Sequence, residues 1–410
     1  MRRTSGFAGM LAAALVIVVA VSPLYGQPTG AGAKAVSDAR TRQAVADARA
    51  VVDAGLGYLK GQQQPDGSWQ RGPREPVAIT ALVVRAFAAD EKVGPGADFV
   101  RKGYDRLLAE QKPDGGIYKD LLANYNTAIA VSALAASPDP AHKEAMGRAV
   151  AYLKGAQFSD AIAAPDGGKV DVNHPYYGGW GYGGSRGPGG GRPDLSNTNV
   201  VLEALSDAGL KPDDPAYQRA LKFVQRLQNH SETNPSPWAG DDGGFVYGIN
   251  EKGEGNSAAG EYDGADGRKM VRSYGSMTYG GLKSMIYAGL SKDDPRVKAA
   301  WEWIRGNWTL DENPGMRAAD PKDAEAGLFY YYQTFGRALG AYDEPRITDV
   351  SGNGHDWRVE LIRELKERQR PDGSFVGIGK WMEDNPVLCT TFSVLALQEA
   401  MGDLGEHPVE

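Results

Sequence analysis

The chain has a single cysteine, Cys389, among its 410 residues. One cysteine excludes a disulfide bond within the chain, and its position excludes a lipid-modified cysteine near the N-terminus. Lysine and arginine form no basic run, and the net charge is −7. Because phosphate binding needs a basic stripe, this charge pattern argues against nucleic acid as a partner. Stability must therefore come from a hydrophobic core, for which the apolar fraction of 41% is ample.

An apolar run near the N-terminus is short for a membrane span. It covers Phe7–Val21, follows Arg2 and Arg3, and precedes a region at residues 22–26 that fits a cleavage site. A transmembrane helix needs roughly 20 residues, whereas this order of charge, apolar run and small residues is typical of a secretory signal peptide. We expect a signal peptide at residues 1–26, export to the periplasm or beyond, and no membrane span in the mature chain. A retained N-terminal anchor is the alternative.

A short signature returns six times along the chain. An aromatic residue leads a helical stretch, a glutamine or asparagine follows, and a glycine-rich turn comes next. The copies are Tyr58–Trp69, Tyr104–Tyr118, Tyr152–Gln157, Phe223–Gln228, Trp303–Asn307 and Gln369–Phe375. An internal repeat of this length predicts an architecture of repeated helical units.

One kind of helix precedes each glycine-rich turn. Its apolar residues recur at three- and four-residue spacing and its charged residues share one face, as in a helix with one solvent-exposed side. We expect such helices at about Ala44–Gln63, Ala97–Gln111, Ala145–Gln157, Pro215–Gln228, Pro295–Asn307 and Trp357–Gln369.

A second kind of helix follows each turn and is apolar nearly all round. A helix without a polar face must be covered on both sides. The starts of these helices are predicted at Thr80, Thr127, Thr198, Thr278, Tyr332 and Thr390. The threonines suit N-caps or first turns of helices.

Six exposed helices that alternate with six buried helices predict an all-α fold, the (α/α)6 toroid of two concentric rings. We expect one domain at residues 44–402, after a linker at residues 27–43 and before a tail at residues 403–410. The two longest insertions, residues 159–195 and 229–276, both precede a buried helix. They are therefore expected to build one rim of the barrel.

The string Tyr58–Trp69 resembles the QW repeat of squalene and hopene cyclases, and weaker repeats of this kind occur in protein prenyltransferase β subunits. The rim segments at residues 176–184, 192–198 and 275–279 resemble secreted bacterial prenyltransferase/squalene oxidase repeat proteins. The resemblance implies a terpenoid cyclase-like toroid. In QW repeats the glutamine caps a helix end and the aromatic ring packs over the turn, which is a structural role.

The catalytic groups of the resembled families are absent from the matching positions. No Asp-x-Asp-Asp acid motif of the cyclases occurs, and the pairs at Asp213, Asp241 and Asp293 lack the leading aspartate. The prenyltransferase zinc site needs Asp-x-Cys and a histidine, but Val387 stands two residues before Cys389. We therefore expect neither a metal nor a cofactor.

Aromatic residues before two buried helices are the candidate ligand-binding groups. They are His174, Tyr176, Tyr177, Trp180 and Tyr182, together with Tyr332 in the run of residues 330–332. Aromatic faces stabilise cations and stack on sugars or lipids. The structural alternative is that these rings pack a long loop onto the barrel.

Asp194, Asp241 and Asp242 are the candidate catalytic acids. Asp194 stands just before a buried helix, where a helix cap is the simpler interpretation. Our leading hypothesis is an exported toroid protein that binds an apolar, isoprenoid-like molecule in its central cavity, with catalysis left open. The alternatives are a structural or protein-interaction module and an (α/α)6 carbohydrate enzyme. A carbohydrate enzyme needs two mouth carboxylates about 5–10 Å apart, for which these three aspartates are the candidates.

Overall fold

The computed structural model describes residues 31–72, 74–165, 167–184 and 191–409. The expected signal peptide at residues 1–26 lies outside the described residues. Across the part of the chain that is described, no helix has both the length and the apolar character needed to cross a membrane.

Within the described residues, six helices form a closed inner ring. Each packs against the next in sequence order, and the last packs against the first. They are α2 (Val77–Ala88), α4 (Ala123–Ala135), α6 (Leu195–Asp207), α8 (Gly275–Tyr287), α10 (Leu328–Tyr342) and α12 (Pro386–Glu406).

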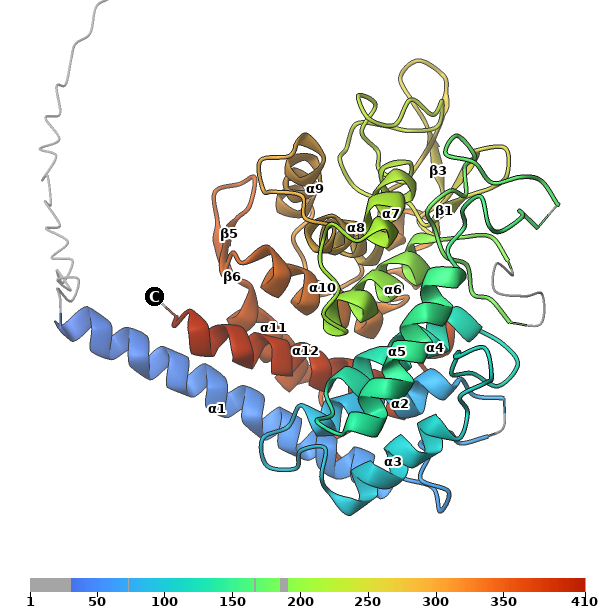
Figure 1. Cartoon of the computed structure of the whole chain (residues 1–410). Coiled ribbons are helices and arrows are strands. Elements are labelled where there is room, and N and C mark those ends of the chain that lie inside the picture. The colour runs from blue at the N-terminus through green and yellow to red at the C-terminus, as the bar shows by residue number, and fades with distance from the viewer. Residues whose placement is uncertain (1–30, 73, 166, 185–190, 410) are drawn as a thin grey trace, which may run out of the picture.

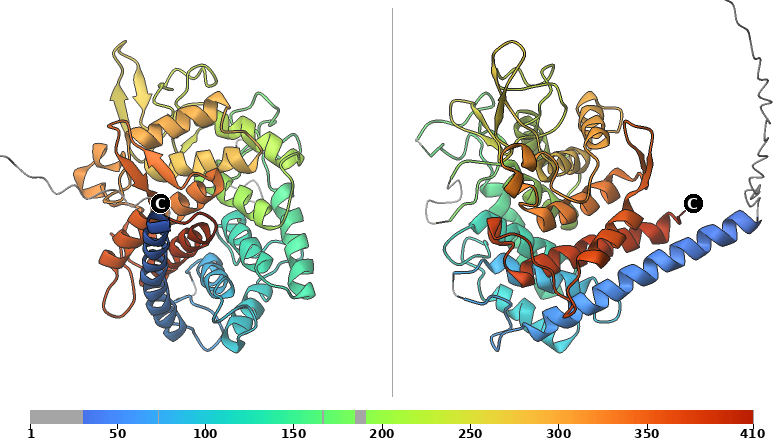
Figure 2. Two further views of the ribbon diagram at one scale, coloured as in Figure 1. Left: turned by 90° about the vertical axis from the view of Figure 1, so that its left-hand side faces the viewer. Right: turned by 180° about the vertical axis from the view of Figure 1, so that it is seen from behind.

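The other six α-helices of the described chain surround this ring. They are α1 (Ala31–Gly61), α3 (Asp98–Leu108), α5 (Pro140–Gly155), α7 (Pro215–Gln225), α9 (Pro295–Gly306) and α11 (Trp357–Arg368). In the left-hand view of Figure 2 the chain follows the rim of the molecule in sequence order, from blue through green to orange. The expected all-α toroid of six helical hairpins is confirmed.

Burial separates the two rings as the apolar pattern predicts. Ten of the twelve residues of α2 are buried, whereas only four of the eleven residues of α3 are. An inner helix is covered by its neighbours on both sides and by its outer partner. An outer helix keeps one face in solvent, where its charged side chains lie.

The inner helices begin three or four residues earlier than predicted. Their threonines therefore lie inside the first turns, and each accepts a hydrogen bond from the backbone of the preceding glycine-rich turn. The Trp69 N–H donates to Thr80 Oγ1 at 3.0 Å, and the Phe375 N–H donates to Thr390 at the same distance. Ile117, Trp180 and Phe245 repeat the contact with Thr127, Thr198 and Thr278.

A side-chain amide ties most outer helices to the next. Gln63 Nε2 donates to the Gly67 carbonyl of its own turn at 3.1 Å and to the Phe99 carbonyl of α3 at 2.7 Å. We call this double contact the Gln–Gly brace. It recurs at Gln111/Gly115, Gln157/Gly178, Gln228/Gly243 and Gln369/Gly373. The last of these reaches back to Val51 of α1 and so closes the ring.

The junction between α9 and α11 departs from this pattern. Asn307 donates to the Trp303 carbonyl within α9 rather than to the next outer helix. Residues 308–327 replace the short turn and contain the 3₁₀ turns η1 (Met316–Ala318) and η2 (Pro321–Asp323). Trp308 Nε1 instead donates to Glu360 of α11 at 2.9 Å.

Short antiparallel hairpins occur in the segments that connect the helices. β1 (Gly248–Ile249) pairs with β2 (Gly255–Asn256), and β3 (Glu261–Asp263) pairs with β4 (Lys269–Val271), all within the insertion at residues 229–276. β5 (Arg346–Thr348) pairs with β6 (Gly354–Asp356) between α10 and α11. Figure 1 shows both long insertions, in green and yellow, on the same side of the molecule.

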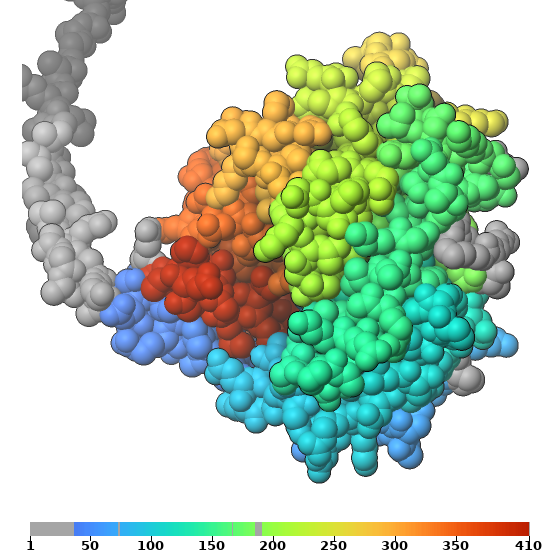
Figure 3. Space-filling view, viewed as in Figure 1, coloured from blue at the N-terminus to red at the C-terminus, as the bar shows by residue number. Residues whose placement is uncertain are grey.

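Both ends of the expected domain are helical beyond their predicted limits. Helix α1 begins at Ala31, within the expected linker, and α12 runs to Glu406, within the expected tail. The C-terminal segment packs on α1, where the Val409 N–H donates to Thr41 Oγ1 at 2.8 Å. Figure 3 shows the red end of α12 lying against blue α1. This contact joins the two ends of the domain, although residues 37–43 of α1 remain exposed or half-buried.

The turn glycines offer a test of the Gln–Gly brace. Gly178 has a φ of +92°, and a Cβ there would lie 1.9 Å from the Arg219 carbonyl oxygen. We expect Gly178→Ala to lower the free energy of unfolding by about 2 kcal/mol or more. Gly57→Ala is the control, because nothing lies within 4 Å of its Cβ position inside α1. It should raise stability by about 0.5–1 kcal/mol in chemical denaturation. Equal changes in the free energy of unfolding for the two substitutions would contradict the close approach of the Gly178 turn to the next outer helix.

Candidate functional site

A cavity of about 590 Å³ lies at the end of the barrel where the inner helices begin. All six inner helices contribute to its wall. Their lining residues include Ala78, Leu82, Tyr125, Ser196, Met277, Tyr330 and Phe392. The volume is within the range of about 300–1,000 Å³ that is typical of small-molecule sites.

The two long insertions build part of the cavity mouth. Tyr182 comes from the insertion at residues 159–195, and Tyr247 and Tyr274 come from the insertion at residues 229–276. The insertions meet at the start of α6, where Asp194 forms β-bridges with Trp180 and with Gly248. The expectation that both insertions form one rim is confirmed.

Aromatic and aliphatic side chains dominate the wall. The aromatic members are Tyr125, Tyr182, Tyr247, Tyr274, Tyr330, Trp381 and Phe392. The ring centroids of Tyr125 and Tyr182 lie 6.5 Å apart, and those of Tyr330 and Phe392 lie 5.9 Å apart at 62°. Among the described residues of the wall there is no lysine or arginine. The cavity therefore suits a mostly apolar molecule.

A buried cluster of charges lies beneath this cavity. Arg85, Glu203, Lys283 and Arg337 each stand seven residues after a lining residue, and a seven-residue step returns to the same helix face about 10 Å further along. Arg85 Nη1 contacts Glu203 Oε1 at 2.8 Å, and Lys283 pairs with the other oxygen of Glu203. Although burial opposes ionisation, the neighbouring Lys283 and arginines hold the pKa of Glu203 well below its usual range. The cluster forms a charged floor under an apolar chamber.

Asp194 is a buried acid at the start of α6. It caps the helix by accepting the Asn197 N–H at 2.8 Å, and the Asn197 side-chain amide donates to its second oxygen at 2.8 Å. Burial raises the pKa of Asp194 to about 7, against the opposing effect of these hydrogen bonds. The Tyr247 hydroxyl also faces this carboxyl group. Asp194 thus lies directly behind a tyrosine of the cavity wall.

Glu383 is a second buried acid, and it lines the cavity itself. It follows the 3₁₀ turn η3 (Lys380–Met382) and is 1% exposed. Its Oε1 accepts the Tyr330 N–H at 2.9 Å at the start of α10, a helix without a capping side chain of its own. Its Oε2 has no hydrogen-bond partner among the described residues. Burial raises the pKa of Glu383 to about 7.

Backbone strain gathers at the mouth of the cavity. Leu122, Trp381 and Met382 have φ between +55° and +67°, and they are three of the four described non-glycine residues in the left-handed region. All three line the cavity. Trp381 is 51% exposed although it is large and apolar. Such strain concentrates at binding sites, because the surrounding structure must hold the residues in place.

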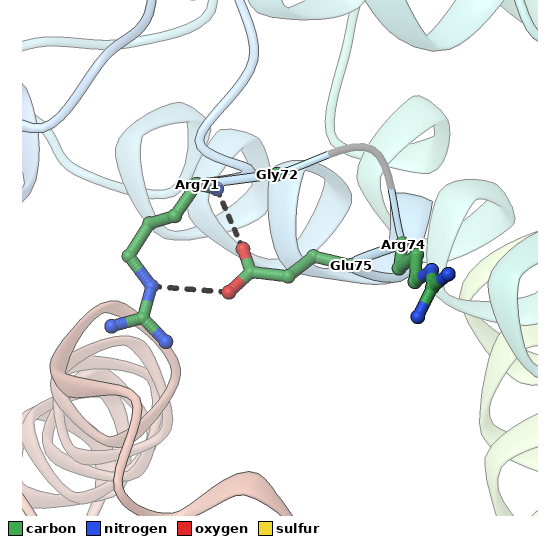
Figure 4. Close-up of a pocket in the computed structure, with 4 residues that line it drawn as sticks. All are labelled: Arg71, Gly72, Arg74 and Glu75. Carbon is green, nitrogen blue, oxygen red and sulfur yellow. Dashed lines mark hydrogen bonds and ion pairs between the residues drawn. The ribbon is translucent and has the colours of Figure 1, made fainter.

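A shallow hollow lies beside the mouth in the loop between α1 and α2. Arg71, Gly72, Arg74 and Glu75 bound it, as Figure 4 shows. Glu75 accepts the Arg71 N–H at 2.6 Å and the Arg71 Nε–H at 3.0 Å. The next residue, Pro76, lines the large cavity. This hollow is formed by four residues of one loop, which also contributes Pro76 to the cavity mouth.

The candidate ligand-binding residues occupy different places. Of His174, Tyr176, Tyr177, Trp180, Tyr182 and Tyr332, only Tyr182 lines the cavity. Trp180 is buried and donates its indole N–H to the Leu153 carbonyl at 2.7 Å. Tyr176 packs on Phe158, and Tyr332 donates its hydroxyl to the Leu310 carbonyl at 2.6 Å. His174 contacts Tyr176 edge-on.

The candidate acids are also separated. Asp241 is exposed and accepts the Ser231 N–H at 2.7 Å. Asp242 accepts the Gly244 N–H at 2.9 Å and the Ser273 hydroxyl at 2.7 Å within the glycine-rich turn. Neither lines the cavity, so the pair does not meet Asp194 across a groove there. No group of three metal-ligating side chains occurs within the described ranges.

No protein-family model and no curated protein matches the sequence. Solved structures do resemble the fold. A variant of the type II terpene cyclase MstE from Scytonema, in complex with geranylgeranyl dihydroxybenzoate, is 15% identical with a TM-score of 0.47, over 88% of this chain and 99% of that one. A protein from Actinoplanes is 18% identical with a TM-score of 0.47, over 87% of this chain and 99% of that one. Similarity at this level does not establish a shared activity.

Sequence reasoning missed Glu383, Tyr247 and Tyr274. The signal for Tyr274 was present, since it immediately precedes the start of an inner helix at the end of a rim insertion. Glu383 carried a weaker signal: an acid between an exposed Trp-Met pair and the proline that opens α12. Only the ring closure brings these segments together.

The raised pKa of Glu383 predicts a pH dependence of stability. The native carboxyl group, with a pKa of about 7 against an ordinary 4.5, binds its proton more tightly than the unfolded chain does. This contribution is complete below about pH 4.5 and is lost as pH rises through 7. We expect the free energy of unfolding to fall between pH 5 and 8, and Glu383→Gln to reduce that fall.

The exposed Glu144, which pairs with Arg148 on α5, gives the control. Glu144→Gln should leave the pH dependence unchanged in denaturation measured at pH 5, 6.5 and 8. Asp194 titrates in the same direction, so a part of the slope should remain in the Glu383 variant. An unaltered slope in Glu383→Gln would contradict the prediction.

Proposed function

We propose that the protein binds an apolar, isoprenoid-like molecule in the cavity at the N-terminal ends of the inner helices. The observation that carries the proposal is the wall: all six inner helices and both rim insertions contribute to one chamber of about 590 Å³. A chamber that only completed the core would be filled by side chains, because protein interiors are close-packed.

The arrangement of polar groups supports an elongated apolar ligand. Tyr182, Tyr247 and Ser196 bring hydroxyl groups to the wall, whereas Leu82, Met277 and Phe392 supply apolar surface. A hydrocarbon chain would bury its length against the apolar side chains and leave a polar end near the hydroxyls. Burial of apolar area is worth about 25 cal/mol per Å², so such contacts would provide most of the affinity.

Filling the chamber tests the proposal. Leu82→Trp adds bulk to a buried lining residue, and we expect the dissociation constant for farnesol to rise at least about tenfold. Val350→Trp is the matched control, because Val350 is 65% exposed and lies away from the cavity wall. Calorimetry would measure binding, and thermal unfolding would establish that each variant folds. Unchanged farnesol binding in folded Leu82→Trp would refute the cavity as the site.

We also propose that the mature protein acts after export. The support is the N-terminal order of Arg2 and Arg3, the apolar run Phe7–Val21 and the candidate cleavage region at residues 22–26. Expression of the whole chain in a bacterial host, with mass spectrometry of the recovered protein, tests this. We expect a mature N-terminus near Gln27 in the periplasmic or external fraction. An intact chain in the cytoplasm would oppose the proposal.

A further inference from the structure

The described residues of the cavity wall include an acidic side chain and no basic one. Glu383 is the one described lining residue with a carboxyl group, and no lysine or arginine faces it across the wall. Burial raises the pKa of the lining phenol Tyr182 to about 12, so its hydroxyl stays uncharged at neutral pH. An anionic head group would therefore meet no counter-charge inside the chamber.

The buried floor does not change this balance. Arg85, Lys283 and Arg337 are the cations below the chamber, and their charges are met by Glu203, Asp207 and Glu399. At the mouth, Arg71 is paired with Glu75. The cations of the floor and Arg71 are thus paired with carboxylates of the protein, and Arg74, beside the mouth and outside the chamber wall, is the basic residue of this loop outside these pairs.

Tyrosine rings surround the same chamber. Tyr125, Tyr182 and Tyr330 line it from α4, the first rim insertion and α10. The Tyr330 hydroxyl meets Ser196 at 3.3 Å and the Asn199 amide at 3.1 Å, which holds this ring in place. The face of an aromatic ring is electron-rich and attracts a cation within about 6 Å of its centroid.

Glu383 adds a carboxyl group with one oxygen that lacks a hydrogen bond within the described part of the chain. Its Oε2 is buried without a hydrogen-bond partner among the described residues, and its Oε1 is held by the α10 backbone. The backbone N–H groups of Leu328, Phe329 and Tyr330 act on this carboxyl group from one side. A buried carboxylate oxygen without a hydrogen bond is still costly, and a positive charge in the neighbouring chamber would lower that cost. Ring faces and an unpaired acid are the two features that recognise an organic cation.

We propose that the ligand of this cavity is cationic: an apolar amine or quaternary ammonium whose head lies among the tyrosine rings near Glu383. The hydrocarbon part of the ligand fills the chamber between Leu82, Met277 and Phe392. This inference rests on the proposed function and narrows it, since it names the charge of the ligand and excludes isoprenoid phosphates.

Three probes with one hydrocarbon chain test the charge preference: farnesylamine, farnesol and farnesyl phosphate. At pH 7.5 the amine is protonated, and we expect calorimetry of the mature protein to show it binding about tenfold more tightly than the alcohol. The phosphate should bind more weakly than the alcohol. Leu82→Trp fills the chamber, so this variant should lose binding of all three probes. That loss would exclude binding of the probes to the outer surface.

Glu383→Gln should reduce the preference and bring the affinity for the amine to within about threefold of the affinity for the alcohol. Glu144→Gln, a change on the exposed face of α5, should keep the full preference. An amine that binds no better than the alcohol, or a phosphate that binds best, overturns the cationic ligand while the cavity proposal stands. Preference retained in Glu383→Gln overturns the role of that acid. Failure of all three probes overturns the proposed function itself.

Discussion

The structure depends on one polar contact, the Gln–Gly brace. A glutamine amide at the end of an outer helix donates to its own turn and to a backbone carbonyl of the next outer helix. Each hydrogen bond contributes about 1 kcal/mol, but its position matters more than its strength. The five braces fix the angle between successive hairpins, and the brace from Gln369 to Val51 joins the last hairpin to the first. Closure of the ring creates the central chamber.

The brace also explains why the turns are built from glycine. At Gly178 the next outer helix approaches so closely that any Cβ would overlap the Arg219 carbonyl. The ring is therefore tight at this outer joint. Both long insertions leave the ring at the end where the inner helices begin. They supply Tyr182, Tyr247 and Tyr274 to the mouth without disturbing the helices beneath.

Charge divides the interior of the barrel into two zones. The lower zone holds Glu203 in a cluster with Lys283 and two arginines, which stabilises the ionised form of Glu203 against the effect of burial. The upper zone holds Asp194 and Glu383 without a cationic side chain beside them, so burial raises the pKa of both acids to about 7. The same residue type behaves oppositely within one barrel because partners, and not burial alone, decide its charge.

The repeat, the two classes of helix and the rim position of the insertions could be read from the sequence. Each of these depends on local periodicity and on chain order, which a sequence records directly. The residues that line the chamber could not be read in the same way. Of the candidates, Tyr182 lines the cavity. Tyr332 bonds to the Leu310 carbonyl in the core, and Asp242 lies in a glycine-rich turn. Glu383 meets Tyr330 only because α10 and α12 are neighbours in a closed ring. The sequence alone determined the two classes of helix and the ring that they form. The tertiary structure decided where each turn glutamine bonds and which side chains face the cavity, because helix rotation and ring closure set those directions.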